Sequence, residues 1–157
     1  MSMSYTVVDL LDKFISIEEA GYGLYMKIAS EASVADNIKV LAKVFALEEK
    51  RHIEKYKKLK VQVKDDPDIA IDISIYDRAS KLVFDFTKIS RNLIIKDTME
   101  LIELCLNFEE ENLALLFMIQ GILVQSQEDE KTTLYKVLTE LIMEEQKHID
   151  NLSIFKK

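Results

Sequence analysis

Apolar residues recur every three or four positions along four long segments of the chain, a spacing typical of amphipathic helices. We expect helices over residues 6–33, 36–60, 97–124 and 129–155. Asp36 is the expected N-cap of the second helix and Asp97 that of the third, where Glu100 follows as in a capping box. Only short segments separate the first helix from the second and the third from the fourth. The pattern therefore predicts two helical hairpins, at about residues 6–60 and 97–155.

The segment between the two hairpins, residues 61–96, is long enough to run the length of a helical bundle. After the polar turn KDDPD it carries apolar residues at helical spacing, namely Ile75, Ala79, Leu82, Phe86, Ile89 and Leu93. We expect an additional helix in this crossover. A lone stripe packs more often against its own domain than against another subunit, so packing within the chain is the favoured interpretation. Residues 1–157 then form a single domain.

Composition supports a helical protein and narrows the choice of partners. The 157 residues include three glycines and one proline, few for the turns of a sheet, so the expected fold class is all-α. The net charge of −7 disfavours nucleic acid and anionic membranes, which attract clustered lysine and arginine. The sequence shows no export signal and no apolar run of membrane-spanning length, so we expect a cytoplasmic protein.

Cys105 is the only cysteine in the sequence. A single cysteine excludes an internal disulfide and any multi-cysteine metal module within these residues. Its expected role is that of a small buried side chain. A metal site in this chain would therefore use oxygen and nitrogen ligands.

Charged residues interrupt each of the four apolar stripes. In chain order they are Glu18, Glu49 with His52, Glu109, and Glu145 with His148. The two Glu-x-x-His pairs lie in the similar segments LEEKRHIEKY and MEEQKHIDNL, and residues three apart lie side by side on one helix face. Each pair therefore presents both groups to one region of the interior. The preceding glutamates, Glu48 and Glu144, lie off the stripes and are expected to face solvent.

Four carboxylates in an apolar core repel one another and lose their hydration, at a cost of about several kcal/mol for each uncompensated ion. No lysine or arginine lies on these stripes, which leaves bound metal or protonation to compensate the charge. The helical rise places the carboxylates of each hairpin at similar heights, roughly 21–27 Å from the intervening turn. One Glu-x-x-His is an ordinary surface pair. Two such pairs, together with two further glutamates within apolar stripes, favour a metal site over a solvated face.

These residues resemble the ferritin-like di-iron carboxylate proteins, and among them the rubrerythrin-like branch, in which two helices carry a glutamate and two carry Glu-x-x-His. The resemblance covers the four long helices and the long crossover between the second and third. It implies a ferritin-like four-helix bundle that holds two iron ions, with manganese or zinc as alternative metals. By this resemblance the terminal ligands are Glu18 and Glu109, the bridging ligands are Glu49 and Glu145, and the imidazole ligands, one per metal, are His52 and His148.

The resemblance extends to Tyr25, seven residues after Glu18, which would lie near the metals. A redox role for Tyr25 and a structural role as a buried tyrosine are equally expected. Two positions depart from the rubrerythrin pattern. Asn112 stands where that family carries a further glutamate that takes part in a redox-linked metal shift, and Phe117 stands where it carries a tyrosine. These departures put efficient peroxidase turnover in question.

Three functions follow as alternatives. The first, implied by the resemblance, is reduction of hydrogen peroxide or O₂. Its electrons would come from an external donor such as a rubredoxin-type protein, because the sequence has no rubredoxin-type cysteine domain. The second is binding or storage of iron without redox turnover, and the third is a metal-free helical interaction module. A homodimer or a larger homo-oligomer is the expected assembly.

Overall fold

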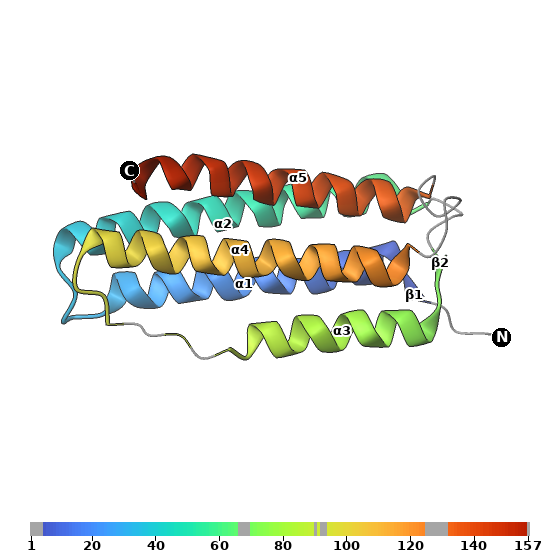
Figure 1. Cartoon of the computed structure of the whole chain (residues 1–157), viewed down its shortest axis with the longest axis horizontal. Coiled ribbons are helices and arrows are strands. Elements are labelled where there is room, and N and C mark those ends of the chain that lie inside the picture. The colour runs from blue at the N-terminus through green and yellow to red at the C-terminus, as the bar shows by residue number, and fades with distance from the viewer. Residues whose placement is uncertain (1–4, 66–69, 90, 92–93, 125–131, 157) are drawn as a thin grey trace.

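The computed structural model describes residues 5–65, 70–89, 91, 94–124 and 132–156. The described residues are almost entirely helical, as expected, and Figure 1 shows their arrangement. The helices are α1 (Val7–Ser30), α2 (Asp36–Val63), α3 (Ile73–Thr87), α4 (Thr98–Leu123) and α5 (Thr133–Ser153), followed by the 3₁₀ turn η3 (Ile154–Lys156). Two short antiparallel strands, β1 (Tyr5–Thr6) and β2 (Ala70–Ile71), pair the start of the chain with the start of the crossover.

The helix ends follow the local capping chemistry, which corrects part of the prediction. Asp97 caps α4 as expected, because its side chain accepts a hydrogen bond from the Glu100 amide at 2.8 Å. Asp36 is not the cap of α2 but its first residue. The N-cap is Ala35, which makes no side-chain cap, and Asp36 instead places a negative charge in the first turn, where the helix dipole favours it. Helix α1 ends at Ser30, before the expected end at residue 33.

The expected start of the fourth helix, at residue 129, lies outside the described residues. The helix is observed from Thr133, and the Thr132 side chain caps it by accepting a hydrogen bond from the Tyr135 amide at 3.2 Å. Its last expected turn, near residue 155, is the 3₁₀ turn η3. The second and third helices match their expected ranges to within three residues, since α2 ends at Val63 and α4 ends at Leu123.

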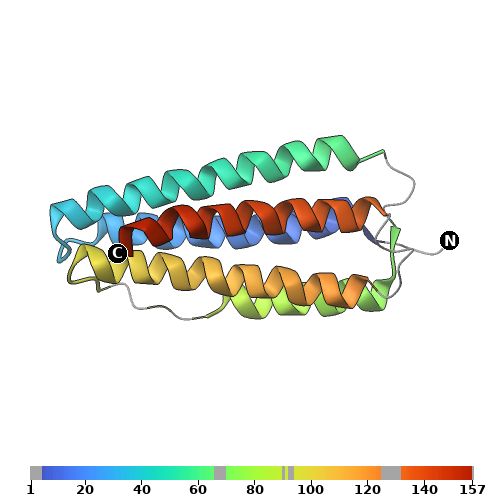
Figure 2. The same cartoon turned by 45° about the horizontal axis from the view of Figure 1, so that its top comes forward.

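The four long helices lie side by side along one axis (Figure 1). Helices α1 and α2 form one antiparallel hairpin, and α4 and α5 form the other. The crossover with α3 returns the chain along the molecule, so that α2 and α4 run in the same direction (Figure 1). Figure 2 shows α5 in front of α1, with α2 on one side of this pair and α4 on the other. All four helices can therefore direct side chains to a common axis.

Helix α3 packs against α1 and α4 of its own chain, in agreement with the expected packing within the domain. Its buried face includes Ala79 and Phe86 of the predicted stripe, together with Tyr76 and Val83, which were not predicted. Ile75 and Leu82 are only partly buried against the core. The helix ends at Thr87, so the exposed Ile89 lies beyond it, and Leu93 lies outside the described residues.

The apolar core consists of two clusters at the two ends of the long helices. One cluster includes Leu11 and Phe14 of α1 and Leu138 of α5, together with the buried face of α3. The other includes Ile28 of α1 and Leu152 of α5. The predicted polar residues of the four stripes occupy the layer between these clusters. The core is therefore interrupted by polar groups at mid-length of the molecule.

Candidate metal centre

All six residues that the sequence singled out as ligands meet in this middle layer. Glu18 comes from α1 and Glu109 from α4, and each of α2 and α5 supplies one Glu-x-x-His pair. The four glutamates are 0% exposed, and the two histidines are 7% exposed. Their placement was expected from helical spacing, and the structure brings them together.

The six side chains form two groups whose potential ligand atoms lie within 4.8 Å of one another. One group holds Glu49, His52, Glu109 and His148, and the other holds Glu18, His52 and Glu145. His52 belongs to both groups. Within the second group, its Nδ1 atom lies 3.4 Å from a carboxylate oxygen of each of Glu18 and Glu145. The Nδ1 atom of His148 lies 3.6 Å from Glu109 Oε1. The two imidazole rings are 4.8 Å apart between centroids and nearly perpendicular.

Many of these polar atoms are buried without a hydrogen-bond partner. The atoms are Oε2 of Glu18, both carboxylate oxygens of Glu49 and Glu109, Oε2 of Glu145, Nδ1 of His52, and both ring nitrogens of His148. A buried polar atom without a partner costs about 1–3 kcal/mol, and more when it is charged. Within the described part of the chain, no lysine or arginine forms an ion pair with any of the four carboxylates. This arrangement fits a cation held between the side chains.

The carboxylates differ in how strongly they hold a proton. Burial and the charges of Glu109 and Glu18 raise the pKa of Glu49 well above its ordinary value. Burial and the same kind of repulsion, from Glu18 and Glu109, raise the pKa of Glu145. Burial also acts against ionisation of Glu18 and Glu109, but interactions with neighbouring carboxyls and with His52 or His148 lower the pKa of both. Without a bound cation, two of the four acids therefore ionise easily and two resist ionisation.

The charge of the cluster also fits bound cations. Four ionised carboxylates carry a charge of −4, which two divalent cations would neutralise, while neutral imidazoles add nitrogen ligands without changing the charge. Cys105 is fully buried near this layer, and burial raises the pKa of its thiol. Cys105 belongs to neither group of potential ligand atoms. The buried glutamates and histidines can hold a metal ion through oxygen and nitrogen alone.

Two further side chains hold the carboxylates in place, and the sequence analysis did not assign these roles. Tyr56 donates a hydrogen bond from its hydroxyl to Glu145 Oε1 at 2.8 Å. Asn112 donates one from its side-chain amide to Glu18 Oε1 at 3.2 Å. Tyr56 lies one turn after His52 on the same apolar stripe, and this position was the available signal. Asn112 was noted only as a departure from the rubrerythrin pattern.

Tyr25 is fully buried in α1, beside Phe45 and Phe108. Burial, followed by interactions with Cys105 and the charge of Glu49, raises the pKa of Tyr25 well above 10, so that its hydroxyl keeps its proton. No hydrogen bond joins this hydroxyl to a described side chain. A redox role for Tyr25 stays a prediction. Phe117 is 53% exposed on α4 and takes no part in the cluster.

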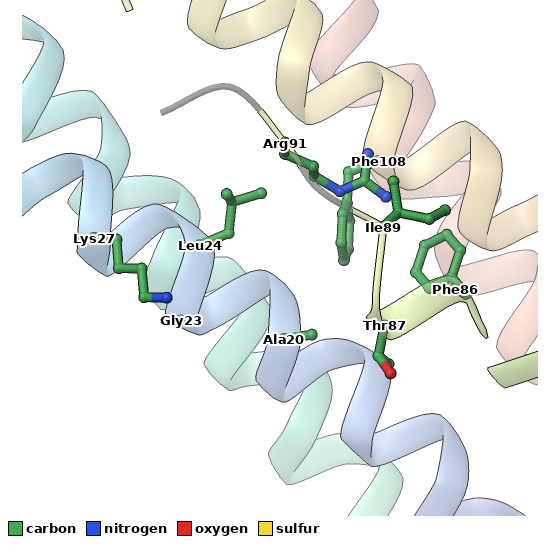
Figure 3. A pocket seen from close by; sticks show the side chains of 9 residues that line it. All are labelled: Ala20, Gly23, Leu24, Lys27, Phe86, Thr87, Ile89, Arg91 and Phe108. Carbon is green, nitrogen blue, oxygen red and sulfur yellow. The ribbon is translucent and has the colours of Figure 1, made fainter. Parts of the chain in front are cut away.

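A close backbone approach explains why glycine occupies position 21. A Cβ atom on Gly21 would lie 3.0 Å from the Phe108 ring and 3.2 Å from Glu49 Oε2. Phe108 in turn lines a hollow of about 480 Å³ between α1 and residues 86–91. Figure 3 shows this hollow, with the Arg91 guanidinium against the Phe108 ring. Phe108 therefore stands between the hollow and the carboxylate layer.

Comparison with known proteins identified no relative of this chain. The chain matches no protein-family model, and no curated protein or solved structure is significantly similar to it. No helix among the described residues combines the length and apolar character needed to cross a membrane.

The raised pKa of Glu49 predicts a pH-dependent stability of the metal-free protein. Because folding raises this pKa above its ordinary value of 4.5, the contribution of Glu49 to stability is present at low pH and is lost as pH rises through the folded-state pKa. Glu49→Gln keeps the shape of the protonated acid without its charge. We expect its melting temperature in EDTA to exceed that of the parent by a margin that grows above pH 4.5. A margin that stays constant with pH, or equals that of the exposed control Glu110→Gln, would contradict the prediction.

Gly21→Ala should disturb the layer between Phe108 and Glu49. Overpacking at a buried site costs about 1–3 kcal/mol, so we expect a lower free energy of unfolding despite the better helix propensity of alanine. Gly23 is the matched control in the same helix, because a Cβ there would meet nothing within 4 Å. Gly23→Ala should stabilise the protein by about 0.5–1 kcal/mol. Urea unfolding of both variants measures the contrast, and equal effects would show that Gly21 is not a close approach.

Proposed function

We propose that this chain is a ferritin-like four-helix bundle of the rubrerythrin-like kind, with a long crossover, that binds two iron ions. Its proposed activity is the reduction of hydrogen peroxide or O₂ with electrons from an external donor. The observation that carries the proposal is the buried cluster of four glutamates and two histidines, most of whose polar atoms lack a partner within the protein. Such a cluster on four helices is the ligand pattern of that class of protein.

The residues of the cluster have separable tasks. Glu18, Glu49, Glu109 and Glu145, with His52 and His148, would hold the metals. Bound iron would supply redox chemistry, with two Fe(II) ions giving the two electrons that, with two protons, convert one hydrogen peroxide to two waters. Tyr56 and Asn112 orient Glu145 and Glu18 through their hydrogen bonds. Such supporting contacts hold ligands in position for the metal.

Metal uptake also requires proton release. Glu49 and Glu145 have raised pKa values in the metal-free protein, because of burial and the charges of the other carboxylates. Their carboxyl oxygens would lose these protons when cations bind, so that uptake is favoured at higher pH. In this proposal the electrons come from an external donor, because a single cysteine cannot form a rubredoxin-type site within these 157 residues.

Binding or storage of iron without redox turnover is the second candidate. The observation in its favour is Asn112. Its side-chain amide donates a hydrogen bond to Glu18, whereas rubrerythrins carry a further glutamate at the position of Asn112. An amide in this place cannot supply the charged ligand that the redox-linked metal shift uses. A metal-free interaction module is the third candidate, and it leaves the unpartnered atoms of the buried cluster without compensation. A melting temperature that does not change on chelation would favour this third function.

Metal analysis tests the proposed site. We expect protein grown with iron to contain about two metal ions per chain. Glu49→Ala and Glu145→Ala, separately and together, should lower this content because each removes one carboxylate of the cluster. Glu48→Ala removes a neighbouring carboxylate outside the cluster and serves as the matched control. Trace metal in the parent protein, or unchanged loading in the double variant, would refute the site.

Stopped-flow oxidation separates redox turnover from storage. For a peroxidase we expect rapid oxidation of the di-ferrous protein by hydrogen peroxide and re-reduction by an added donor over repeated cycles. Storage predicts a single oxidation without such cycles. Asn112→Glu would restore the residue type of the rubrerythrin pattern, and an increase in turnover would identify Asn112 as the limiting position. Absence of cycling in both proteins would leave storage as the function of the iron site.

A further inference from the structure

The histidines are the side of the cluster that lies nearest to solvent. All four glutamates are fully buried, whereas both imidazoles keep a small exposed fraction. A pocket of about 230 Å³ reaches both imidazoles between α2 and α5. The remaining residues around it are Glu48, Arg51, Lys55, Glu144, Lys147 and Asn151. The larger hollow of Figure 3 is lined by none of the six cluster residues, and Phe108 separates it from them.

An ion pair spans the pocket from one helix to the other. Lys55 of α2 binds Glu144 of α5, and both side chains are partly exposed. A second ion pair, between Arg51 and Glu48, lies along α2. The two segments with the pattern Glu-Glu-x-basic-His are residues 48–52 and 144–148. In each, the second glutamate and the histidine belong to the cluster, and the first glutamate and the basic residue lie at the rim of the pocket.

The charged residues at the rim of the pocket bear on which small molecules can enter it. Three basic residues and two carboxylates line the pocket, which gives a net charge of +1 when the histidines are neutral. The net charge of the rim is small, so the rim does not hinder a small uncharged molecule. The pocket is also small, about 230 Å³, and the ion pair between Lys55 and Glu144 joins two of the residues that line it.

We propose that this pocket is the access route by which a small uncharged oxidant of the peroxide class reaches the metal centre, and that the ion pair between Lys55 and Glu144 limits the size of the molecules admitted. The inference rests on the proposed function for the identity of the oxidant. The route itself is a property of the protein without metal, so it can be tested separately. Lys55 and Glu144 act on access and are not ligands.

The first test measures access to the imidazoles in the metal-free protein. Diethyl pyrocarbonate acylates neutral imidazole, and because the chain has two histidines the absorbance change reports these two groups. Lys55→Ala removes the ion pair and should raise the rate roughly two- to fivefold, the range expected for loss of one partly exposed pair. Lys55→Arg keeps the pair and should react like the parent. Asn151→Trp fills the pocket and should lower the rate.

Met143→Trp is the matched control for the bulky substitution, because Met143 is exposed on the same helix and does not line the pocket. It should react like the parent. Circular dichroism shows whether each variant keeps its helices. If Lys55→Ala and Asn151→Trp both react at the parent rate, the access route is wrong, whatever metal the protein binds.

The second test uses the iron-loaded protein and compares hydrogen peroxide with the bulkier tert-butyl hydroperoxide. Lys55→Ala should accelerate oxidation by the bulkier reagent more than oxidation by hydrogen peroxide, and Asn151→Trp should slow both. An unchanged ratio of the two rates in Lys55→Ala would overturn the role of the ion pair. A protein that takes up no iron would refute the proposed function, while the acylation rates would still decide whether the pocket leads to the histidines.

Discussion

The burial of four carboxylates in one layer is the constraint on which the rest of this structure depends. Ionised acids at such close range repel one another and lose hydration, and burial alone would leave them protonated or drive water into the core. Part of this cost is offset by raised pKa values of Glu49 and Glu145, which favour their neutral forms, and by hydrogen bonds from Tyr56 and Asn112. Many oxygens and nitrogens still lack partners. This unsatisfied polar layer is physically consistent with a site built to receive cations.

The surrounding fold isolates and positions this layer. Apolar clusters fill the space between the long helices on both sides of it, so that stability comes from packing at the two ends while the middle carries the polar groups. The crossover with α3 covers α1 and α4 and returns the chain, which lets the two hairpins face each other (Figure 1). Glycine at position 21 leaves room for the Phe108 ring and the Glu49 carboxylate beside α1. The six candidate ligands lie on helices rather than on loops, which favours a fixed arrangement of their side chains.

The repeated Glu-Glu-x-basic-His segment has two functions in one turn of helix. Its second glutamate and its histidine face inward, while its first glutamate and its basic residue line the pocket above the imidazoles. Sequence analysis expected Glu48 and Glu144 to face solvent. Both side chains are partly exposed at the rim, where each also forms an ion pair. Asn112 differs from the rubrerythrin pattern, in which this position is a glutamate. Its side-chain amide donates a hydrogen bond to Glu18.

The sequence by itself determined the helices, the additional helix in the crossover and the six residues of the cluster. These follow from local periodicity, since residues three or four apart share a helix face whatever the rest of the chain does. It failed at the start of α2, where the N-cap is Ala35 and not Asp36, and at part of the buried face of α3, where packing against α1 and α4 decides which residues are buried. Only the tertiary structure decided that His52 lies between Glu18 and Glu145, that Tyr56 holds Glu145, and that a pocket opens over the histidines. Those features depend on how each helix is rotated against its neighbours, and side chains 89 residues apart, such as Tyr56 and Glu145, have no local signal for that rotation.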